Sequence, residues 1–308
     1  MTTEGVPLKG YRGRFAPSPT GPLHFGSLVA AVGSYLDARA AGGEWLLRME
    51  DVDEPRAVPG AADEILFALE RLGFSWDGEI IHQSRRKTHY RAAFERLRLD
   101  GSVFACACSR REVADSALGP DGAPRYPGTC RNGLPHGREA RAWRLKVEPG
   151  LVCFDDALQG RICQDLAAEV GDFVVLRADG YFAYQLAVVV DDADQGVTHV
   201  VRGADLIDST PRQICLQRRL GLARPAYLHL PAALNAAGEK LSKQTRARPI
   251  HGDRPQAALV AALEFLGQQP PADLPDADLD DLWRWAIMHW DRSGLPHRRS
   301  AATPAAYS

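Results

Sequence analysis

Apolar residues in the first hundred positions alternate between helical spacing and short, strand-like runs. Helical spacing covers residues 28–36, 65–72 and 90–97, and strand-like runs cover residues 45–49 and 80–81. A glycine follows each helical pattern, at Gly42, Gly73 and Gly101, as is typical of helix ends. Strands that alternate with helices in this way predict βαβ units and a parallel sheet.

The alternation breaks from about residue 102 to residue 180, where turns, arginines and three cysteines gather. Strand-like stretches resume at 181–193 and 197–203, and a helix at 210–220 and a strand at 226–230 follow. We therefore predict an α/β fold: a nucleotide-binding parallel sheet whose halves, residues 1–101 and 181–245, are interrupted by an insertion at 102–180. Residues 246–308 look helical, and we expect the last dozen residues to be mobile.

Composition narrows the class of protein without identifying it. The net charge of the 308 residues is −2, so a nucleic-acid partner must be met by local basic patches. The start lacks the apolar segment of a signal peptide, and the apolar runs, such as 186–190, are too short for a membrane span. These features predict a cytoplasmic protein without a membrane partner. We expect a monomer, although no residue pattern determines the oligomeric state.

The stretch RFAPSPTGPLHFGSL, residues 14–28, places a turn rich in proline and glycine directly before a helix. The N-terminus of a helix offers unpaired N–H groups and partial positive charge, which suit a phosphate. Gly21 and Gly26 allow a ligand to approach the backbone closely, and His24 could donate a hydrogen bond to phosphate oxygens. The alternative is a proline-rich turn with a surface histidine.

A second motif, EKLSKQ at residues 239–244, follows the last predicted strand. Two lysines around a serine can stabilise the negative charge that grows on a leaving pyrophosphate. Alone, a loop rich in lysine is usually a solvated surface. The two motifs together, on opposite halves of an interrupted sheet, favour a nucleotide site.

The paired motifs PSPTGPLHFG and KLSK resemble the signatures of class I aminoacyl-tRNA synthetases, and within them the glutamyl-tRNA synthetase branch. The resemblance implies ATP as substrate, with Mg²⁺, and catalytic roles for His24 and Lys243. The residues that it assigns to ATP are Pro17, His24, Gly26, Ser27, Lys240, Ser242 and Lys243. The motifs depart from the common pattern at Ser27, in place of histidine, and at Gln244, in place of serine.

Glutamate carries two carboxylates and one ammonium group, so its pocket requires arginines and an acid. Arg14 and Ser18 flank the opening turn at a predicted strand end, where α/β sheets bind ligands, and Glu50 ends the next strand. Tyr184 and Arg202 come from strand-like stretches of the second half. The resemblance assigns glutamate to Arg14, Phe15, Ala16, Pro17, Ser18, Glu50, Tyr184 and Arg202. The alternative for each is a structural salt bridge or a packed side chain.

Cys106, Cys108 and Cys130 offer three thiolates, whereas a structural zinc site wants four ligands. Candidates for the fourth are His136, Asp115, Glu112 and Tyr126. Spacing alone favours His136, because histidine is a common zinc ligand. A small subgroup of the resembled enzymes has Cys-x-Cys…Tyr-x-x-x-Cys as its zinc site, which implies Tyr126. Reduced cysteines without a metal are the alternative.

The other cysteines, Cys153, Cys163 and Cys215, lie in apolar contexts and do not suggest a disulfide scaffold. We expect them to be small buried hydrophobic residues.

Only 64 residues follow Gln244, too few for the anticodon-binding region of a full glutamyl-tRNA synthetase. The resemblance is therefore to truncated paralogues, which activate glutamate without tRNA and transfer it to queuosine at the wobble position of tRNA(Asp). Basic stretches at 85–87, 110–111 and 138–146 could follow RNA phosphates or be solvated faces. The alternatives are a synthetase that charges the tRNA 3′ end, and a catalytically silent, zinc-bearing RNA-binding paralogue.

Overall fold

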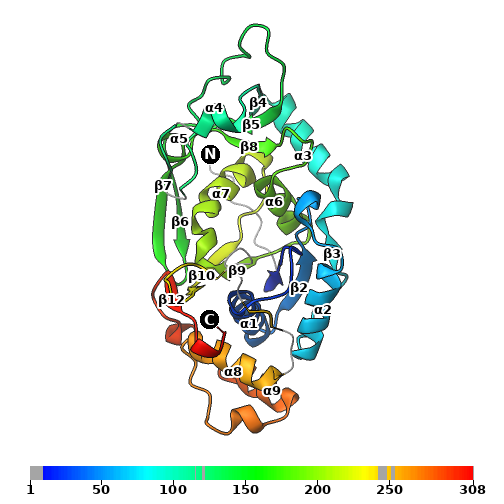
Figure 1. Cartoon of the computed structure of the whole chain (residues 1–308), viewed down its shortest axis with the longest axis vertical. Helices are drawn as coiled ribbons and strands as arrows, with labels where there is room; N and C mark the ends of the chain where they lie inside the picture. The colour runs from blue at the N-terminus through cyan, green and yellow to red at the C-terminus, as the bar shows by residue number, and fades with distance from the viewer. Residues whose placement is uncertain (1–9, 115, 120–121, 242–247, 251–253, 308) are drawn as a thin grey trace.

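Parallel strands form the centre of the molecule, in the order β3-β2-β1-β9-β10 (Figure 1). The computed structural model describes residues 10–114, 116–119, 122–241, 248–250 and 254–307. The strands are β1 (Arg12–Phe15), β2 (Glu44–Met49), β3 (Ile81–His82), β9 (His199–Gly203) and β10 (Ala226–Leu230). Thr198 N donates to Arg12 O over 2.9 Å, which joins the two halves at β1 and β9. This doubly wound order confirms the predicted nucleotide-binding fold and puts its topological switch between β1 and β9.

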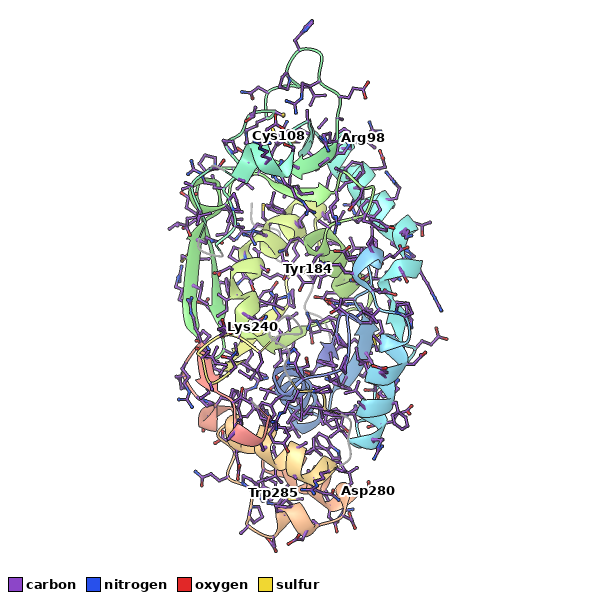
Figure 2. The ribbon with its side chains drawn as sticks, in the orientation of Figure 1. Arg98, Cys108, Tyr184, Lys240, Asp280 and Trp285 are labelled. Atoms are coloured by element: carbon purple, nitrogen blue, oxygen red, sulfur yellow. A yellow bond between two sulfur atoms is a disulfide. The ribbon has the colours of Figure 1, made fainter. Side chains whose placement is uncertain are left out.

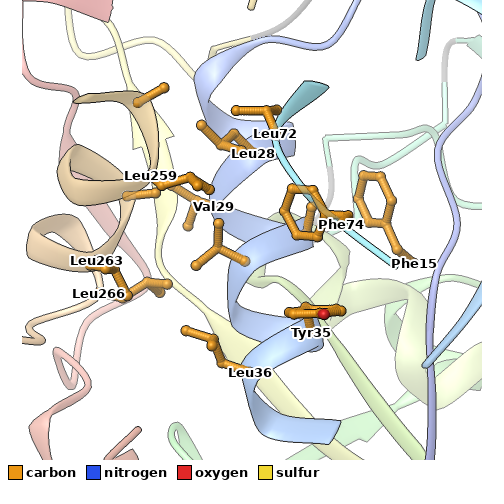
Figure 3. Packing of buried hydrophobic residues seen from close by; sticks show 14 of the residues in the cluster. Phe15, Leu28, Val29, Tyr35, Leu36, Leu72, Phe74, Leu259, Leu263 and Leu266 are labelled. Carbon is orange, nitrogen blue, oxygen red and sulfur yellow. The ribbon is translucent and has the colours of Figure 1, made fainter. Parts of the chain in front are cut away.

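Helices cover both faces of this sheet: α1 (Phe25–Ala40), α2 (Ala61–Arg71), α3 (Lys87–Leu99), α6 (Tyr184–Asp194) and α7 (Thr210–Leu220). Most of α1 is buried, because the sheet packs on one side of it and C-terminal helices on the other. Figure 3 shows Leu28, Val29 and Leu36 of this helix between two groups of apolar side chains. Leu259, Leu263 and Leu266 form one group, and Phe15, Leu72 and Phe74 belong to the other.

Residues 102–180 build one end of the molecule and one edge of the main sheet (Figure 1). An antiparallel sheet is formed by β4 (Val103–Cys106), β5 (Ala142–Leu145) and β8 (Phe173–Leu176), with α4 (Arg110–Ala114) beside it. The hairpin of β6 (Leu151–Asp156) and β7 (Gly160–Asp165), with α5 (Leu166–Glu169) after it, joins the main sheet, since β6 runs parallel to β10. The domain boundaries at 101 and 180 stay a prediction.

The C-terminal helices α8 (Pro255–Phe265) and α9 (Leu279–Met288) lie at the opposite end from the insertion (Figure 1). Short 3₁₀ turns complete the chain: η1 (Glu54–Arg56), η2 (Gln83–Arg85), η3 (Ala204–Ser209), η4 (Leu274–Asp276), η5 (Arg292–Gly294) and η6 (Ala305–Tyr307). None of the helices in the described ranges has both the length and the apolarity that a membrane crossing needs.

One stretch predicted to be a strand is a helix. Residues 184–194 form α6, whereas the helix at 210–220 and the strand at 226–230 were predicted correctly. The run Leu186–Val190 is buried throughout, and a continuous apolar run fits a buried helix as well as a buried strand. Tyr184 is accordingly the first residue of a helix rather than part of a strand.

The expectation of a mobile C-terminal tail is also wrong. Residues Ser300–Ala302 form β12, which pairs in parallel with β11 (Ala232–Leu234). Ala301 is buried in the main core, and Thr303 N donates to Leu234 O over 2.9 Å. The tail is therefore held by a sheet partner that lies 68 residues earlier, which local composition does not reveal.

Two cysteines expected to be buried hydrophobic residues are joined instead. Cys153 and Cys163 face each other across β6 and β7 and form a disulfide. Cys163 is exposed, and Cys153 and Cys215 are half-buried, so none of the three is fully buried. The pairing follows from the register of the hairpin, because residues directly opposite in antiparallel strands bring their Cβ atoms close together.

Candidate functional site

A cavity of about 500 Å³ opens at the carboxyl ends of the parallel strands β1, β2, β9 and β10. Doubly wound sheets bind ligands at this edge, next to the topological switch. Figure 2 shows Tyr184 and Lys240 near the middle of the molecule, where this cavity lies. Every residue expected to contact glutamate lines it: Arg14, Phe15, Ala16, Pro17, Ser18, Glu50, Tyr184 and Arg202.

The residues expected to bind ATP divide into two groups. Those that line the same cavity are Pro17, His24, Gly26, Ser27 and Lys240. Ser242 and Lys243 lie outside the described residues. Lys240 forms an ion pair with Asp205 at the start of η3, so the first lysine of the KLSK motif is tied to the end of β9.

The turn before α1 shapes one wall of the cavity. His24 is the N-cap of this helix, and its Nδ1 accepts a hydrogen bond from Ser27 N over 3.2 Å. A Cβ at Gly26 would lie 3.2 Å from the His24 ring, tighter than ordinary contact, so glycine leaves room for the imidazole. The helix has no acidic residue in its first turn, and its positive end therefore faces the cavity without a carboxylate that would repel a phosphate.

Arg202 is held on two of its three nitrogen atoms. Nε donates to His229 Nε2 over 3.1 Å, and Nη2 donates to Thr210 and Gln213 over 2.8 and 2.9 Å. Nη1 is buried and has no hydrogen-bond partner within the part of the chain that the structure describes. A buried, charged donor without a partner is costly. Because Arg202 lines the cavity, a ligand carboxylate would satisfy it.

A buried histidine and aspartate set the orientation of Arg202. His229 Nδ1 lies 2.6 Å from Asp156 Oδ2, and both side chains are fully buried. Burial, together with the positive charge of Arg202, lowers the pKa of His229 to about 4 despite the nearby carboxylate. Burial alone would raise the pKa of Asp156, but its hydrogen bond and charge interaction with His229 hold it below the usual value. The neutral imidazole therefore donates to Asp156 and accepts from Arg202.

Glu50 and Arg14 belong to a second buried network on the opposite wall. Arg48 donates to Glu50 over 3.1 Å and to Asp192 over 2.8 Å, and Arg14 pairs with Asp192 at 3.2 Å. Burial raises the pKa of Glu50, and the charges of Arg48 and Arg14 oppose this shift. For Asp192 burial also acts to raise the pKa, but Arg14 and Arg48 outweigh it and lower the value.

This second network suits an amino-acid ligand. Arg14 uses Nε for Asp192, and no other side-chain partner of Arg14 occurs among the described residues, so its terminal nitrogens can serve a carboxylate. Burial and the nearby Glu50 raise the pKa of Tyr184, which keeps its hydroxyl protonated and able to donate. Arg14, Arg202, the carboxylate of Glu50 and the neutral hydroxyl of Tyr184 thus line one cavity.

The cysteine cluster lies far from this cavity, in the insertion (Figure 2, Cys108). The sulfur atoms of Cys106, Cys108 and Cys130 all lie within 4.8 Å of one another, a group that could hold a metal ion. Cys108 Sγ and Cys130 Sγ are 3.7 Å apart, and sulfurs bound tetrahedrally to one zinc ion would be separated by about 3.8 Å. The three thiols therefore have the spacing that such an ion needs.

Tyr126 is the fourth group of the cluster. Its hydroxyl oxygen lies 3.5 Å from Cys106 Sγ and 3.8 Å from Cys108 Sγ, close to the separation of about 3.5 Å that an oxygen and a sulfur ligand of one zinc ion would show. His136 is exposed and Glu112 bonds to Ser109 and Arg138, and neither joins the cluster; Asp115 lies outside the described residues.

Arg144 provides positive charge beside these ligands. Its guanidinium lies 3.8 Å from the centroid of the Tyr126 ring, and its Nε donates to Cys106 Sγ over 3.3 Å. Three thiolates and a phenolate would exceed the charge of a divalent ion, so a neighbouring cation stabilises such a site.

Comparison with known proteins decides the family. The family described as tRNA synthetases class I (E and Q), catalytic domain, matches residues 11–274. The chain is 62% identical to a glutamyl-Q tRNA(Asp) synthetase of Aromatoleum aromaticum, over 97% of this chain and 94% of that one. It is also 62% identical to one of Dechloromonas aromatica, over 96% of this chain and 99% of that one.

The chain belongs to the glutamyl-Q tRNA(Asp) synthetase family.

Solved structures agree with this family in fold. A glutamate-tRNA synthetase of Elizabethkingia anophelis, 25% identical, superposes with a TM-score of 0.78 over 97% of this chain and 69% of that one. A glutamate tRNA ligase of Elizabethkingia meningosepticum in complex with its amino acid, 24% identical, gives a TM-score of 0.79. The class I catalytic fold that the motifs implied is therefore confirmed.

Sequence reasoning missed three residues of this glutamyl-Q family member. Asp156 and His229 were not singled out, nor was Asp192, although His229 is buried against Arg202, Asp192 against Arg14, and Asp156 against His229. The available signal was a polar residue inside an otherwise apolar stretch: His229 within Ala226–Leu230, and Asp192 after the run of valines. Such residues are rarely buried unless they are paired.

Proposed function

We propose that the chain activates L-glutamate with ATP and transfers the glutamyl group to queuosine at the wobble position of tRNA(Asp). The observation that carries the proposal is the cavity, in which Arg14, Glu50, Tyr184 and Arg202 surround a space of about 500 Å³ beside the start of α1. The names of relatives that are 54–62% identical support the queuosine-bearing substrate.

The first step joins glutamate to AMP. An oxygen of the glutamate α-carboxylate attacks the α-phosphorus of ATP, and the bond to the leaving pyrophosphate breaks. No side-chain nucleophile is needed, so positioning and charge stabilisation supply the catalysis. We assign the phosphates, with their Mg²⁺, to His24 at the start of α1 and to Lys240 and Lys243 of the KLSK motif.

Glutamate is bound by groups of matching charge. In this assignment Arg202 Nη1 and Arg14 receive carboxylate oxygens, Tyr184 donates its hydroxyl hydrogen, and Glu50 accepts from the ammonium group. The ammonium would lower the raised pKa of Glu50, so substrate binding favours the ionised carboxylate. In the second step a nucleophile of the RNA attacks the activated carbonyl and AMP leaves.

We further assign a structural zinc ion to Cys106, Cys108, Tyr126 and Cys130, as their spacing supports. When bound, the ion would cross-link the insertion rather than take part in the reaction, because a closed set of four protein ligands leaves no position for substrate. The cytoplasmic location and the monomeric state expected from the sequence stay predictions.

Glutamate-dependent exchange of pyrophosphate into ATP, without RNA, tests the first step. We expect exchange by the intact protein. In Arg202→Lys we expect the KM for glutamate to rise by about tenfold or more, because lysine cannot reproduce the fixed fork of donors of arginine. The exposed Arg284 of α9 supplies the control: Arg284→Lys should leave the KM unchanged. Exchange that appears only when tRNA is added would indicate a synthetase that charges the tRNA 3′ end.

Transfer of radiolabelled glutamate tests the second step. Label should enter tRNA(Asp) that carries queuosine and not the same tRNA lacking it. Label on unmodified tRNA(Glu) would contradict the proposal, and absence of both exchange and transfer would indicate a catalytically silent paralogue.

A further inference from the structure

A second cavity, of about 540 Å³, is lined by residues that lie close along the chain to residues of the glutamate cavity. Two chain segments line both: Glu50 and Tyr184 face the first cavity, and Val52 and Phe182 face the second. Two residues of extended chain span at most about 7 Å, so along both segments the backbones that line the two cavities are within about 7 Å of each other. The assignments made above for glutamate and ATP leave this second cavity unused.

The floor of this cavity carries an unused hydrogen-bond acceptor. Gln83 is fully buried, and its Nε2 donates to Asp191 over 2.8 Å. Its Oε1 is buried and accepts no hydrogen bond from the residues that the structure describes. Because Nε2 is held by Asp191 and Gln83 lines the cavity, Oε1 remains available to a ligand that brings an N–H or O–H group.

The walls combine an arginine with aromatic rings. Arg91 lies over the Phe182 ring at 5.2 Å from its centroid and has no ion-pair partner among the described carboxylates. Lys87 lies 5.8 Å from the centroid of the half-buried Tyr181 and pairs with Glu54. Asp53 pairs with Arg56 and Arg177, and Asp179 pairs with Arg177, so these two carboxylates are matched by two arginines. Of the two cations that line the cavity, Lys87 is paired and Arg91 is left to meet a ligand anion.

Hydrogen bonds hold both walls in place before any ligand binds. Asp51 accepts from the backbone and hydroxyl of Ser84 over 2.8 and 2.7 Å, which fixes η2 and the start of α3. Arg177 Nη1 donates to Asp53 over 2.7 Å and ties the turn before α6 to the segment after β2. A site formed in advance loses less entropy when its ligand binds.

We propose that this second cavity binds a nucleotide of the RNA substrate, next to the nucleotide that receives glutamate. Aromatic faces that stack on bases, beside cations that meet phosphates, are how proteins bind unpaired nucleotides. Tyr181 stacks on the base, Gln83 Oε1 accepts from it, and Arg91 meets a phosphate. The inference rests on the proposed function, since that supplies the RNA.

A matched pair of variants tests the stacking role. Tyr181→Ala removes the ring and Tyr181→Phe keeps it. The probe is tRNA(Asp) bearing queuosine, labelled with fluorescein, and its Kd is read by fluorescence anisotropy. We expect Tyr181→Ala to raise the Kd and the KM for tRNA by about fivefold or more, and Tyr181→Phe to change them by less than about twofold. Pyrophosphate exchange without RNA should stay the same in both.

Arg91→Ala tests the phosphate contact. We expect weaker binding of tRNA. We also expect the slope of log K against log salt concentration to become shallower by about one. The control is Arg98→Ala, since Arg98 is exposed on the same helix but does not line the cavity (Figure 2). Arg98→Ala should bind tRNA more nearly like the intact protein than Arg91→Ala does.

Other results would overturn the assignment of this cavity. Binding of tRNA by Tyr181→Ala at the normal Kd would do so, as would a fall in exchange equal to the fall in binding. Failure of the proposed function is a separate result: the intact protein would then transfer no glutamate to tRNA. The anisotropy measurement would still decide whether the cavity takes an RNA nucleotide.

Discussion

At the scale of single residues, the orientation of Arg202 depends on a histidine that never touches the ligand cavity. His229 accepts from Arg202 and donates to Asp156, which comes from β6 of the insertion. The hairpin of the insertion thereby reaches Arg202, which lines the cavity, through two side chains. A buried polar chain of this kind is stable only while every member keeps its partner.

The buried His229 makes stability depend on pH. Its pKa in the folded chain is lowered to about 4, against 6.5 when unperturbed. Between these values the unfolded chain binds a proton that the folded chain does not, so the free energy of unfolding falls as the pH drops from 6.5 to 4, by on the order of 3 kcal/mol. His229→Gln keeps a donor and an acceptor but does not titrate, and urea unfolding at pH 7 and pH 5 should show a smaller loss of stability.

The exposed His89 provides the control for that measurement. His89→Gln should lose as much stability between pH 7 and pH 5 as the unmodified chain does. An equal loss in His229→Gln would contradict the assignment of a neutral histidine. Protonation of Asp156 occupies a separate window, because its lowered pKa affects stability only below about its ordinary value of 3.8.

Single residues of the site were largely predictable, because short motifs bring their chemistry with them. Arg14, Ser18 and His24 lie in one continuous stretch, so their proximity needed no knowledge of the fold. His229 and Asp156 are 73 residues apart, and no local pattern connects them. The roles of Arg14, Ser18 and His24 in glutamate or ATP binding stay predictions until the exchange assays are made.

At the scale of elements, α1 is the part of the fold that most directly shapes the site. Its first turn faces the cavity, and its middle packs closely on β10. A Cβ at Gly33 would lie 2.4 Å from Leu230 Cδ1, so the helix and the strand approach more closely than an alanine would allow. Leu230 is buried and also lines the cavity.

Gly33→Ala should therefore destabilise the protein although alanine favours helices. The gain in helix propensity is about 1 kcal/mol, whereas overpacking of a core costs about 1–3 kcal/mol. We expect a lower midpoint of urea unfolding, and partial recovery when Leu230→Val is combined with it. Ala40→Ser, at the exposed end of the same helix, should have little effect. Stability of Gly33→Ala at or above that of the unmodified chain would contradict the packing argument.

Helices whose apolar residues recur at a clear helical period were predicted well, and the helix without such a period was not. The helix Thr210–Leu220 begins with proline in its first turn and ends at Gly221, which has a left-handed φ of 63°. The run before Asp191 has no period, because α6 is buried by the sheet and by neighbouring helices on several sides. Burial on all sides removes the polar face that would have identified a helix.

At the scale of the whole molecule, the cysteine cluster and the cavity proposed for glutamate belong to separate parts of the core. Phe104, Val113 and the three clustered cysteines belong to a small apolar cluster apart from the two larger ones. We expect about one zinc ion per chain by elemental analysis, and its loss in Cys130→Ser. Because the cavity does not contact this cluster, glutamate-dependent exchange should survive that substitution at room temperature, while the insertion unfolds at lower temperature.

Tyr126 and His136 make a matched pair for the fourth ligand. Tyr126→Phe removes only the hydroxyl that faces the sulfurs, and we expect it to weaken zinc binding in competition with a chelator. His136→Ala should leave zinc binding unchanged, since that side chain is exposed and outside the cluster. The reverse result would restore the histidine that spacing alone favoured.

The sequence by itself determined the alternation of strands and helices, the two nucleotide motifs and the residue types of the cavity, because each is encoded within a short stretch of chain. The tertiary structure decided the rest: the helix at Tyr184–Asp194, the disulfide between Cys153 and Cys163, the pairing of β12 with β11, and the partner of Arg202. These features depend on contacts between residues far apart in the chain. Their energies come from burial and from hydrogen bonds that exist only once the strands are adjacent.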